Sequence, residues 1–171
     1  MMLAPQLQLN GTRLTIGPGM SGIRQTLRAM RRMVQAWRVD PQLRQTATTL
    51  VTLTPQRDQL AEVEVIFSWV RDHVRYVRDV HEVETLMTPD KVLAARLGDC
   101  DDQATLLATL LESVGYPTRF VAAGYTDPRS VDHVYLQVFA LGEWIDADPT
   151  EPHPLGWAPP DPVAMIIEGV N

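Results

Sequence analysis

Cys100 is the only cysteine of the 171-residue chain, and it lies in the stretch GDCDDQA, between aspartates and directly before a leucine-rich run. A thiol can act as a nucleophile, ligate a metal, or serve as a small buried side chain. Nucleophilic chemistry requires a base that removes the thiol proton and a third group that orients the base. The chain holds four histidines from which such a base would come.

His133 is the histidine best placed to be that base. It begins the alternating run HVYLQVF, and a second alternating run, GEWIDADPT, follows Leu141 and Gly142. If these two residues form a tight turn, His133 and Asp148 become diagonal neighbours on one face of a sheet. Diagonal neighbours lie about 7 to 8 Å apart at the backbone, within reach of a hydrogen bond, whereas Asp146 lies two positions further away. Asp148 is therefore the predicted orienting carboxylate, unless a bulge or a longer turn changes the register.

The element that must hold the thiol is a helix that begins at Cys100. The following residues are apolar on most of the helical circumference as far as Val114, which predicts a central, buried helix. A helix amino terminus carries about half a positive charge, which favours a thiolate. The neighbouring Asp99, Asp101 and Asp102 oppose it, because negative charge raises a thiol pKa unless the carboxylates cap the helix or point away. The residues alone leave open that Cys100 is a small buried side chain and His133 a sheet-surface histidine.

Further helices and strands are predicted from hydrophobic periodicity and from three residue pairs in which a helix-capping residue is followed by proline. Asn10-Gly11 between alternating runs predicts an amino-terminal hairpin. Helices are expected over 23–38, after Asp40-Pro41, after Thr54-Pro55, and from Thr88-Pro89 to a stop at Gly98; strands are expected at 120–123, 131–140 and 143–148. The predicted fold class is α+β, with a helical amino-terminal half packed on an antiparallel sheet.

Domain organisation is predicted from length and composition. A chain of 171 residues with 45% hydrophobic content suits a single domain, 1–171. Residues 1–55 would form a hairpin and helical extension, and 57–150 the core. Six of the thirteen prolines lie between Pro149 and Pro162. The segment 151–171 is therefore expected to be a rigid tail packed on the core.

Charge and cysteine content restrict the binding partners and the cellular location that we expect for the protein. Residues 1–86 contain eleven arginines and eight acidic residues, whereas 87–171 contain four basic and thirteen acidic residues. A nucleic-acid partner is not expected for the acidic half that contains Cys100. The arginines of the 23–38 helix are expected to form a solvated face, with phosphate or an acidic protein as the alternative. A lone cysteine, the lack of a long apolar run and the lack of a secretory signal predict a cytoplasmic protein without membrane contact.

The stretches GDCDDQATLLATLLESVGYPTRFV, HVYLQVF and GEWIDADPT together resemble the transglutaminase-like superfamily, over roughly residues 57 to 150. The resemblance implies a core that is a permuted relative of papain-type thiol enzymes. It places the family's Cys-His-Asp triad on Cys100, His133 and Asp148. FSWVRDHVRYVRDVHEVETLMTP and HPLGW look like compact members from bacterial, phage and prophage genomes.

The implied activity is amide hydrolysis or acyl transfer on protein or peptide carboxamides through a thioester. Animal cross-linking members have an aromatic residue directly after the cysteine, whereas this chain has Asp101. This difference puts cross-linking in doubt and makes hydrolysis at least as strong an expectation. The alternative is a non-catalytic structural or assembly protein of a phage-like particle, with a phage structural protein as partner and a virion location.

Two further site predictions concern the oxyanion and a metal. The backbone N–H of Cys100 is the natural first oxyanion donor, and Tyr76 is a candidate second donor, with a core tyrosine as its alternative. No cofactor is expected. Calcium could bind the hard carboxylate oxygens of Asp99, Asp101 and Asp102. The resemblance allows this, because some bacterial transglutaminase-like proteases use calcium. Helix capping and solvated charge explain the three aspartates more simply.

Overall fold

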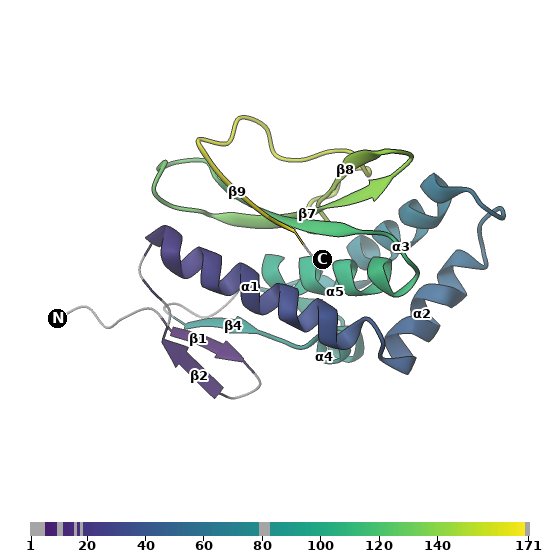
Figure 1. The fold of residues 1–171 in the computed structure, drawn as a ribbon, viewed down its shortest axis with the longest axis horizontal. Helices are drawn as coiled ribbons and strands as arrows, with labels where there is room; N and C mark the ends of the chain where they lie inside the picture. The colour runs from purple at the N-terminus through teal and green to yellow at the C-terminus, as the bar shows by residue number, and fades with distance from the viewer. Residues whose placement is uncertain (1–5, 10–11, 16, 18, 79–82, 170–171) are drawn as a thin grey trace.

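Five helices and a four-stranded antiparallel sheet make up most of the computed structural model, which describes residues 6–9, 12–15, 17, 19–78 and 83–169 (Figure 1). The helices are α1 (Gly19–Trp37), α2 (Pro41–Val51), α3 (Gln59–His73), α4 (Pro89–Ala95) and α5 (Cys100–Ser113). The strands are β1 (Gln6–Leu9), β2 (Thr12–Thr15), β3 (Arg75–Tyr76), β4 (Val83–Leu86), β5 (Leu97–Gly98), β6 (Thr118–Gly124), β7 (His133–Ala140), β8 (Glu143–Ala147) and β9 (Ala164–Gly169). The predicted α+β class is confirmed.

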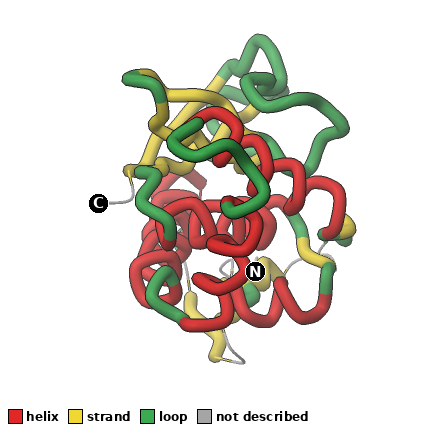
Figure 2. The backbone as a smooth tube through the Cα atoms, turned by 90° about the vertical axis from the view of Figure 1, so that its right-hand side faces the viewer, coloured by secondary structure: helices red, strands yellow, loops and turns green. Residues whose placement is uncertain are grey.

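The large sheet has the strand order β8-β7-β6-β9, and the helices gather on one side of it (Figure 2). Phe139 of β7 lies opposite Trp144 of β8, which is the register that a two-residue turn requires. Leu141 and Gly142 have φ values of 55° and 85°, as in the turn type that matches strand twist. The predicted β7–β8 hairpin is therefore confirmed.

Helix α5 lies at the centre of the molecule, between the sheet and the other helices (Figure 1). Every residue from Asp101 to Leu111 is buried. Its leucines contribute four of the largest fully buried side chains, Leu106, Leu107, Leu110 and Leu111. The prediction of a central, buried helix that begins at Cys100 is confirmed, and the core holds this helix rigidly against the sheet.

The start of α3 differs from the prediction. Asp40 caps α2 as expected, and its Oδ1 accepts hydrogen bonds from the N–H groups of Gln42 and Leu43. The prediction that Thr54-Pro55 starts the next helix is wrong, because α3 begins at Gln59 after the cap Asp58. Arg57 has a φ of 62°, which no right-handed helix accommodates, so the chain turns before the helix starts.

The end of α4 also differs from the prediction. The helix begins at Pro89 as expected, but it ends at Ala95, and Arg96 rather than Gly98 takes the left-handed conformation after it. Gly98 lies in β5, which pairs in parallel with β3. A Cβ atom at Gly98 would lie 2.7 Å from Cβ of Asp102, so the glycine allows α5 to approach this strand.

The amino-terminal strands β1 and β2 pair antiparallel, as the hairpin prediction required. Asn10 and Gly11 lie outside the described residues. Strand β4 adds to β1 in parallel, which was not predicted. This pairing joins residues about 77 positions apart in the chain, from Gln6 opposite Val83 to Leu9 opposite Leu86, so no local pattern reveals it.

The segment after Asp148 runs across the outer face of the sheet and returns as β9, a strand that was not predicted. The N–H of Gly156 donates to the carbonyl of Asp146, and β9 pairs antiparallel with β6. Val121, Ala123 and Tyr135 form a second, small buried cluster on this face, against which Ala158 packs. Among the described residues, no helix combines the length and apolar character needed to cross a membrane.

Candidate active site

Cys100 is the first residue of α5, and the preceding Asp99 caps the helix. Asp99 Oδ1 accepts the N–H of Asp102 at 3.1 Å, which fixes the chain direction just before the sulfur. The half-buried Cys100 packs on the core, and the backbone N–H of Val134 hydrogen-bonds to its sulfur. Since Val134 directly follows His133, the thiol lies at the start of β7.

His133 and Asp148 form a direct contact, with 2.6 Å between Nε2 and Oδ2. Asp148 is 1% exposed, and its other oxygen, Oδ1, accepts the backbone N–H and the hydroxyl of Thr150 at 3.0 and 2.7 Å. A carboxylate whose two oxygens both accept hydrogen bonds needs Nε2 of the imidazole to carry the hydrogen. The second ring nitrogen, Nδ1, then remains for proton exchange.

The predicted trio is thus brought together by α5, β7 and the end of β8. The Asp148 contact with His133 matches the geometry that the diagonal register predicted, and Asp146 instead accepts a hydrogen bond from Gln137. The catalytic roles of the three residues stay predictions. Thr150 was not predicted as part of the site, although its position two residues after Asp148 is typical of a side chain that bonds back to the carboxylate.

The surroundings of Cys100 keep its thiol neutral. Burial raises the pKa of Cys100, the charges of Asp101 and Asp99 raise it further, and the Val134 N–H acts in the opposite direction. The thiol also points at Oδ1 of Asp101 at 3.6 Å. The resting sulfur is therefore protonated, and any nucleophilic step needs a base to remove its proton.

The three aspartates around Cys100 are buried and hold the local chain in place. Asp99 caps α5, Asp101 contacts the thiol, and Asp102 Oδ1 accepts the backbone N–H of Met87 at 2.8 Å. Within the described part of the chain, no three His, Cys, Asp or Glu side chains are grouped so that they could share a metal ion. The calcium site that the sequence allows on Asp99, Asp101 and Asp102 stays a prediction.

Tyr76 lies on the same side of the molecule as Cys100. Burial is the main cause that raises the pKa of Tyr76, followed by the charges of Cys100 and Asp99. Its side chain is 47% exposed, so the alternative of a core tyrosine is wrong. The position leaves Tyr76 available to a molecule bound beside the sulfur, and its role as an oxyanion donor stays a prediction.

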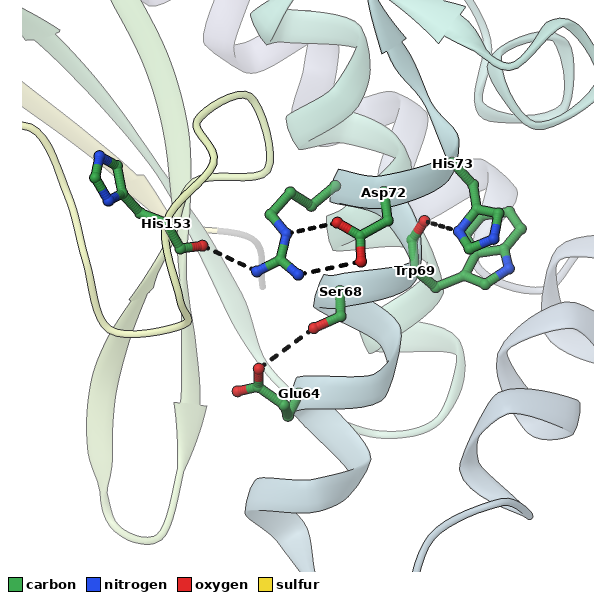
Figure 3. Close-up of polar contacts among 7 residues, drawn as sticks. Glu64, Ser68, Trp69, Asp72, His73 and His153 are labelled. Carbon is green, nitrogen blue, oxygen red and sulfur yellow. Dashed lines mark hydrogen bonds and ion pairs between the residues drawn. The ribbon is translucent and has the colours of Figure 1, made fainter.

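A groove of about 700 Å³ adjoins the site, between the end of α3 with β3 and the segment 149–154. Arg71 bonds to both walls, to Asp72 of α3 and to His153 of the opposite segment, two residues that Figure 3 labels. Nη1 of Arg71 donates to the carbonyl of His153 at 3.0 Å, while Nε and Nη2 donate to Asp72 at 2.8 and 3.1 Å. Arg71 therefore ties the segment that follows Asp148 to α3 across the groove.

Comparison with family models matches residues 45–149 to the transglutaminase-like superfamily. The match begins within α2, twelve residues before the predicted start of the core at residue 57. A search of curated protein sequences gave no significant match.

Three solved structures share the fold at low sequence identity. A candidate cysteine protease from Cytophaga hutchinsonii is 19% identical over 72% of this chain and 41% of its own, with a TM-score of 0.51. A candidate protease from Parabacteroides distasonis is 15% identical over 75% of this chain and 26% of its own, with a TM-score of 0.60. Legionella pneumophila LapG is 19% identical over 84% of this chain and 81% of its own, with a TM-score of 0.53.

The chain therefore spans less than half of the first two structures and most of the third. Such identities show a common fold, and the family model covers more than half of the chain, including Cys100, His133 and Asp148. The chain belongs to the transglutaminase-like superfamily.

Proposed function

We propose that the protein is a cysteine-dependent amide hydrolase or acyltransferase that acts on protein or peptide carboxamides through a thioester. The observation that carries this proposal is the contact of His133 with the buried Asp148, next to a cysteine that opens the central helix. Fixed orientation of the base by a carboxylate is what nucleophilic thiol and hydroxyl enzymes have in common.

The first half of the reaction forms the thioester. Nδ1 of His133 removes the thiol proton as the sulfur of Cys100 adds to the carbonyl carbon of the bound amide. The imidazolium, stabilised by Asp148, then passes this proton to the amide nitrogen, and the carbon–nitrogen bond breaks to release an amine. The general base is needed because the resting thiol is neutral.

The second half releases the acyl group. Nδ1 of His133 removes a proton from water or from an amine, which adds to the thioester carbon. The carbon–sulfur bond breaks, and the proton returns to the sulfur of Cys100, which restores the resting enzyme. Water gives a carboxylic acid, and an amine gives a new amide.

The tetrahedral intermediate carries a negative oxygen that needs hydrogen-bond donors. The backbone N–H of Cys100 is a candidate, since the first N–H groups of a helix have no partner within the helix. The hydroxyl of Tyr76 is the candidate second donor, supported by the pairing of Tyr76 with Gly98, two residues before Cys100.

Turnover is tested with casein and model peptide amides, each with and without a fluorescent primary amine, for the wild type and Cys100→Ala. Amine incorporation that Cys100→Ala lacks indicates transfer, and cleavage alone indicates hydrolysis. We expect cleavage to exceed incorporation, because Asp101 replaces the aromatic residue of cross-linking members. If neither product forms, the proposal fails in favour of the structural or phage-assembly role. Parallel reactions with calcium and with a chelator test the calcium site that the sequence allows: faster turnover with calcium supports the site, and equal rates argue against it.

A further inference from the structure

A basic and aromatic surface adjoins the groove beside Cys100. We call it the β3 surface, and it consists of His73, Arg75, Tyr76, Arg78 and Arg96. All five side chains are exposed. Its parts come from the end of α3, from β3 and its continuation, and from the residue before β5.

The backbone fixes the β3 surface relative to the thiol. The N–H of Arg75 donates to the carbonyl of Arg96 at 2.9 Å, and Tyr76 pairs with Gly98, two residues before Cys100. The strand pair therefore positions both arginines at a defined place next to the start of α5. Arg75 and Tyr76 also line the groove, so a peptide that occupies the groove contacts this surface.

The arginines of the β3 surface are exposed. Arg75, Arg78 and Arg96 form no ion pair with any residue that the structure describes. The guanidinium of Arg96 lies over the ring of Trp69 at 4.3 Å from its centroid, and this ring in turn stacks on His73. Such stacking holds a guanidinium in place while leaving its N–H groups open to a ligand.

Acidic groups also lie near the β3 surface. Asp72 is paired with Arg71, whose charge it offsets. Glu151 lies on the opposite wall, together with His153. Asp99 and Asp101 lie close enough to raise the pKa of Tyr76, but both are buried, whereas the three arginines are exposed to a ligand.

We propose that the β3 surface selects peptide segments that carry Asp or Glu next to the carboxamide on which Cys100 acts. The inference rests on the proposed function and adds its substrate class. The volume of about 700 Å³ falls in the range of about 300 to 1,000 Å³ that bound ligands occupy. Carboxylates match the planar, two-pronged geometry of exposed guanidinium groups. A peptide fits better than a nucleic acid because the groove ends at groups suited to amide chemistry.

Binding is measured by fluorescence anisotropy with full-length Cys100→Ala, so that no turnover is needed. The probes are labelled peptides of one sequence, in which two positions beside a glutamine are both Glu, both Gln or both Lys. We expect the Glu peptide to bind about 2- to 25-fold more tightly than the Gln peptide, since each of the two exposed ion pairs contributes about fivefold at most. The advantage should shrink as salt rises from low to high concentration.

Charge reversal by Arg75→Glu with Arg96→Glu should turn the preference toward the Lys peptide. The matched control, Arg24→Glu with Arg28→Glu, changes two exposed arginines of α1 outside the groove and should leave it unchanged. Circular dichroism checks that each variant folds. If the reversed variant unfolds, Arg75→Gln with Arg96→Gln should still abolish the preference for Glu.

Equal affinity for the three peptides overturns the inference, as does a preference that survives both β3 substitutions. A single-stranded oligonucleotide that displaces the Glu peptide and binds more tightly also overturns it, in favour of a nucleic-acid surface. If casein is turned over but the peptides show no charge preference, selection by the β3 surface is wrong and the proposed function stands. If binding is charge-selective but no Glu peptide is turned over, the proposed function is wrong. The β3 surface then binds acidic peptides that are not substrates.

Discussion

Asp101 is the residue that acts most directly on the reactivity of Cys100. Its carboxylate lies 3.6 Å from the sulfur, and after burial its charge is the largest cause that raises the pKa of Cys100. The proposed mechanism therefore has to overcome this effect through His133. A neutral thiol is also protected from oxidation and alkylation between catalytic cycles, because the thiolate is the reactive form.

Asp101→Asn should make Cys100 react faster with iodoacetamide at neutral pH. Removing the negative charge lowers the thiol pKa, and below the pKa each unit of lowering gives about ten times more thiolate. The rate is measured from pH 6 to 10 by mass spectrometry of the alkylated protein. Asp161→Asn, an exposed acid at a left-handed position, serves as the control and should match the wild type. An unchanged profile for Asp101→Asn would show that its carboxylate does not control the thiol.

Thr150 holds the carboxylate that orients His133. Its hydroxyl and its backbone N–H both bond to Oδ1 of Asp148, which leaves Oδ2 for the imidazole. Thr150→Val keeps the shape and removes one hydrogen bond to a charged group, so kcat should fall about tenfold with KM unchanged. Thr150→Ser should restore the rate. A change in KM alone, or no rescue by serine, would assign Thr150 a role in substrate binding or packing.

At the scale of elements, α5 supports both the core and the site. Leu107 is fully buried in it. Leu107→Ala should lower the free energy of unfolding by about 2 to 5 kcal/mol, through lost burial and the cavity left behind. Urea unfolding measures this effect, with Leu53→Ala as control, because Leu53 is 75% exposed. A loss below about 1 kcal/mol at Leu107 would mean that α5 is not the centre of the core.

The elements that the sequence predicts well are those with local signals. Asp40-Pro41 starts α2, the apolar circumference marks α5, and Leu141-Gly142 sets the β7–β8 register from which the His133–Asp148 contact follows. Local signals mispredict an element when an unusual backbone conformation or a contact with a distant segment determines where that element begins or pairs. The left-handed Arg57 delays α3 to Gln59, in spite of the helix-start pattern at Thr54-Pro55.

Contacts between distant segments explain the remaining differences. Arg71 bonds to the carbonyl of His153, 82 residues away, and no spacing pattern can indicate a backbone acceptor so far along the chain. Strand β9 has only six residues and follows a proline-rich stretch, so its sequence alone does not indicate a strand. Its pairing with β6 defines it. The candidate site was predictable because its carboxylate and histidine lie on one hairpin, whereas the groove depends on tertiary contacts.

At the scale of the whole molecule, the helical half and the sheet share one core. Buried residues from α1 to β9 form a single cluster that α5 joins. We expect one cooperative unfolding transition in urea, as small single domains show. Trp37 and Trp69 lie in the helical half, and Trp144 and Trp157 in the sheet half. Tryptophan fluorescence and far-ultraviolet circular dichroism should therefore give the same midpoint, and two separate midpoints would indicate two folding units.

The stability of the whole molecule should depend on Cys100 at alkaline pH. Its pKa in the folded protein is raised above the ordinary value of 9.0, so above this pH the unfolded chain loses the proton that the folded chain retains. The unfolded state then binds fewer protons, and the free energy of unfolding falls as pH rises. Cys100→Ser does not titrate there and should lose less stability between pH 8 and 10.5. Equal slopes for the two proteins would contradict a raised thiol pKa.

Cys100 is proposed to form an acyl-enzyme with the help of His133 and Asp148. The most direct measurement is mass spectrometry of the intact protein after rapid mixing with p-nitrophenyl acetate, followed by peptide mapping. The chain has one cysteine and one lysine, Lys91, so the acetylated side chain can be assigned without ambiguity. We expect a transient acetyl group on Cys100, formed and released about 10² to 10⁴ times more slowly in His133→Ala and more slowly in Asp148→Asn. Acetylation at Lys91 alone, or equal rates in the wild type and both variants, would contradict it.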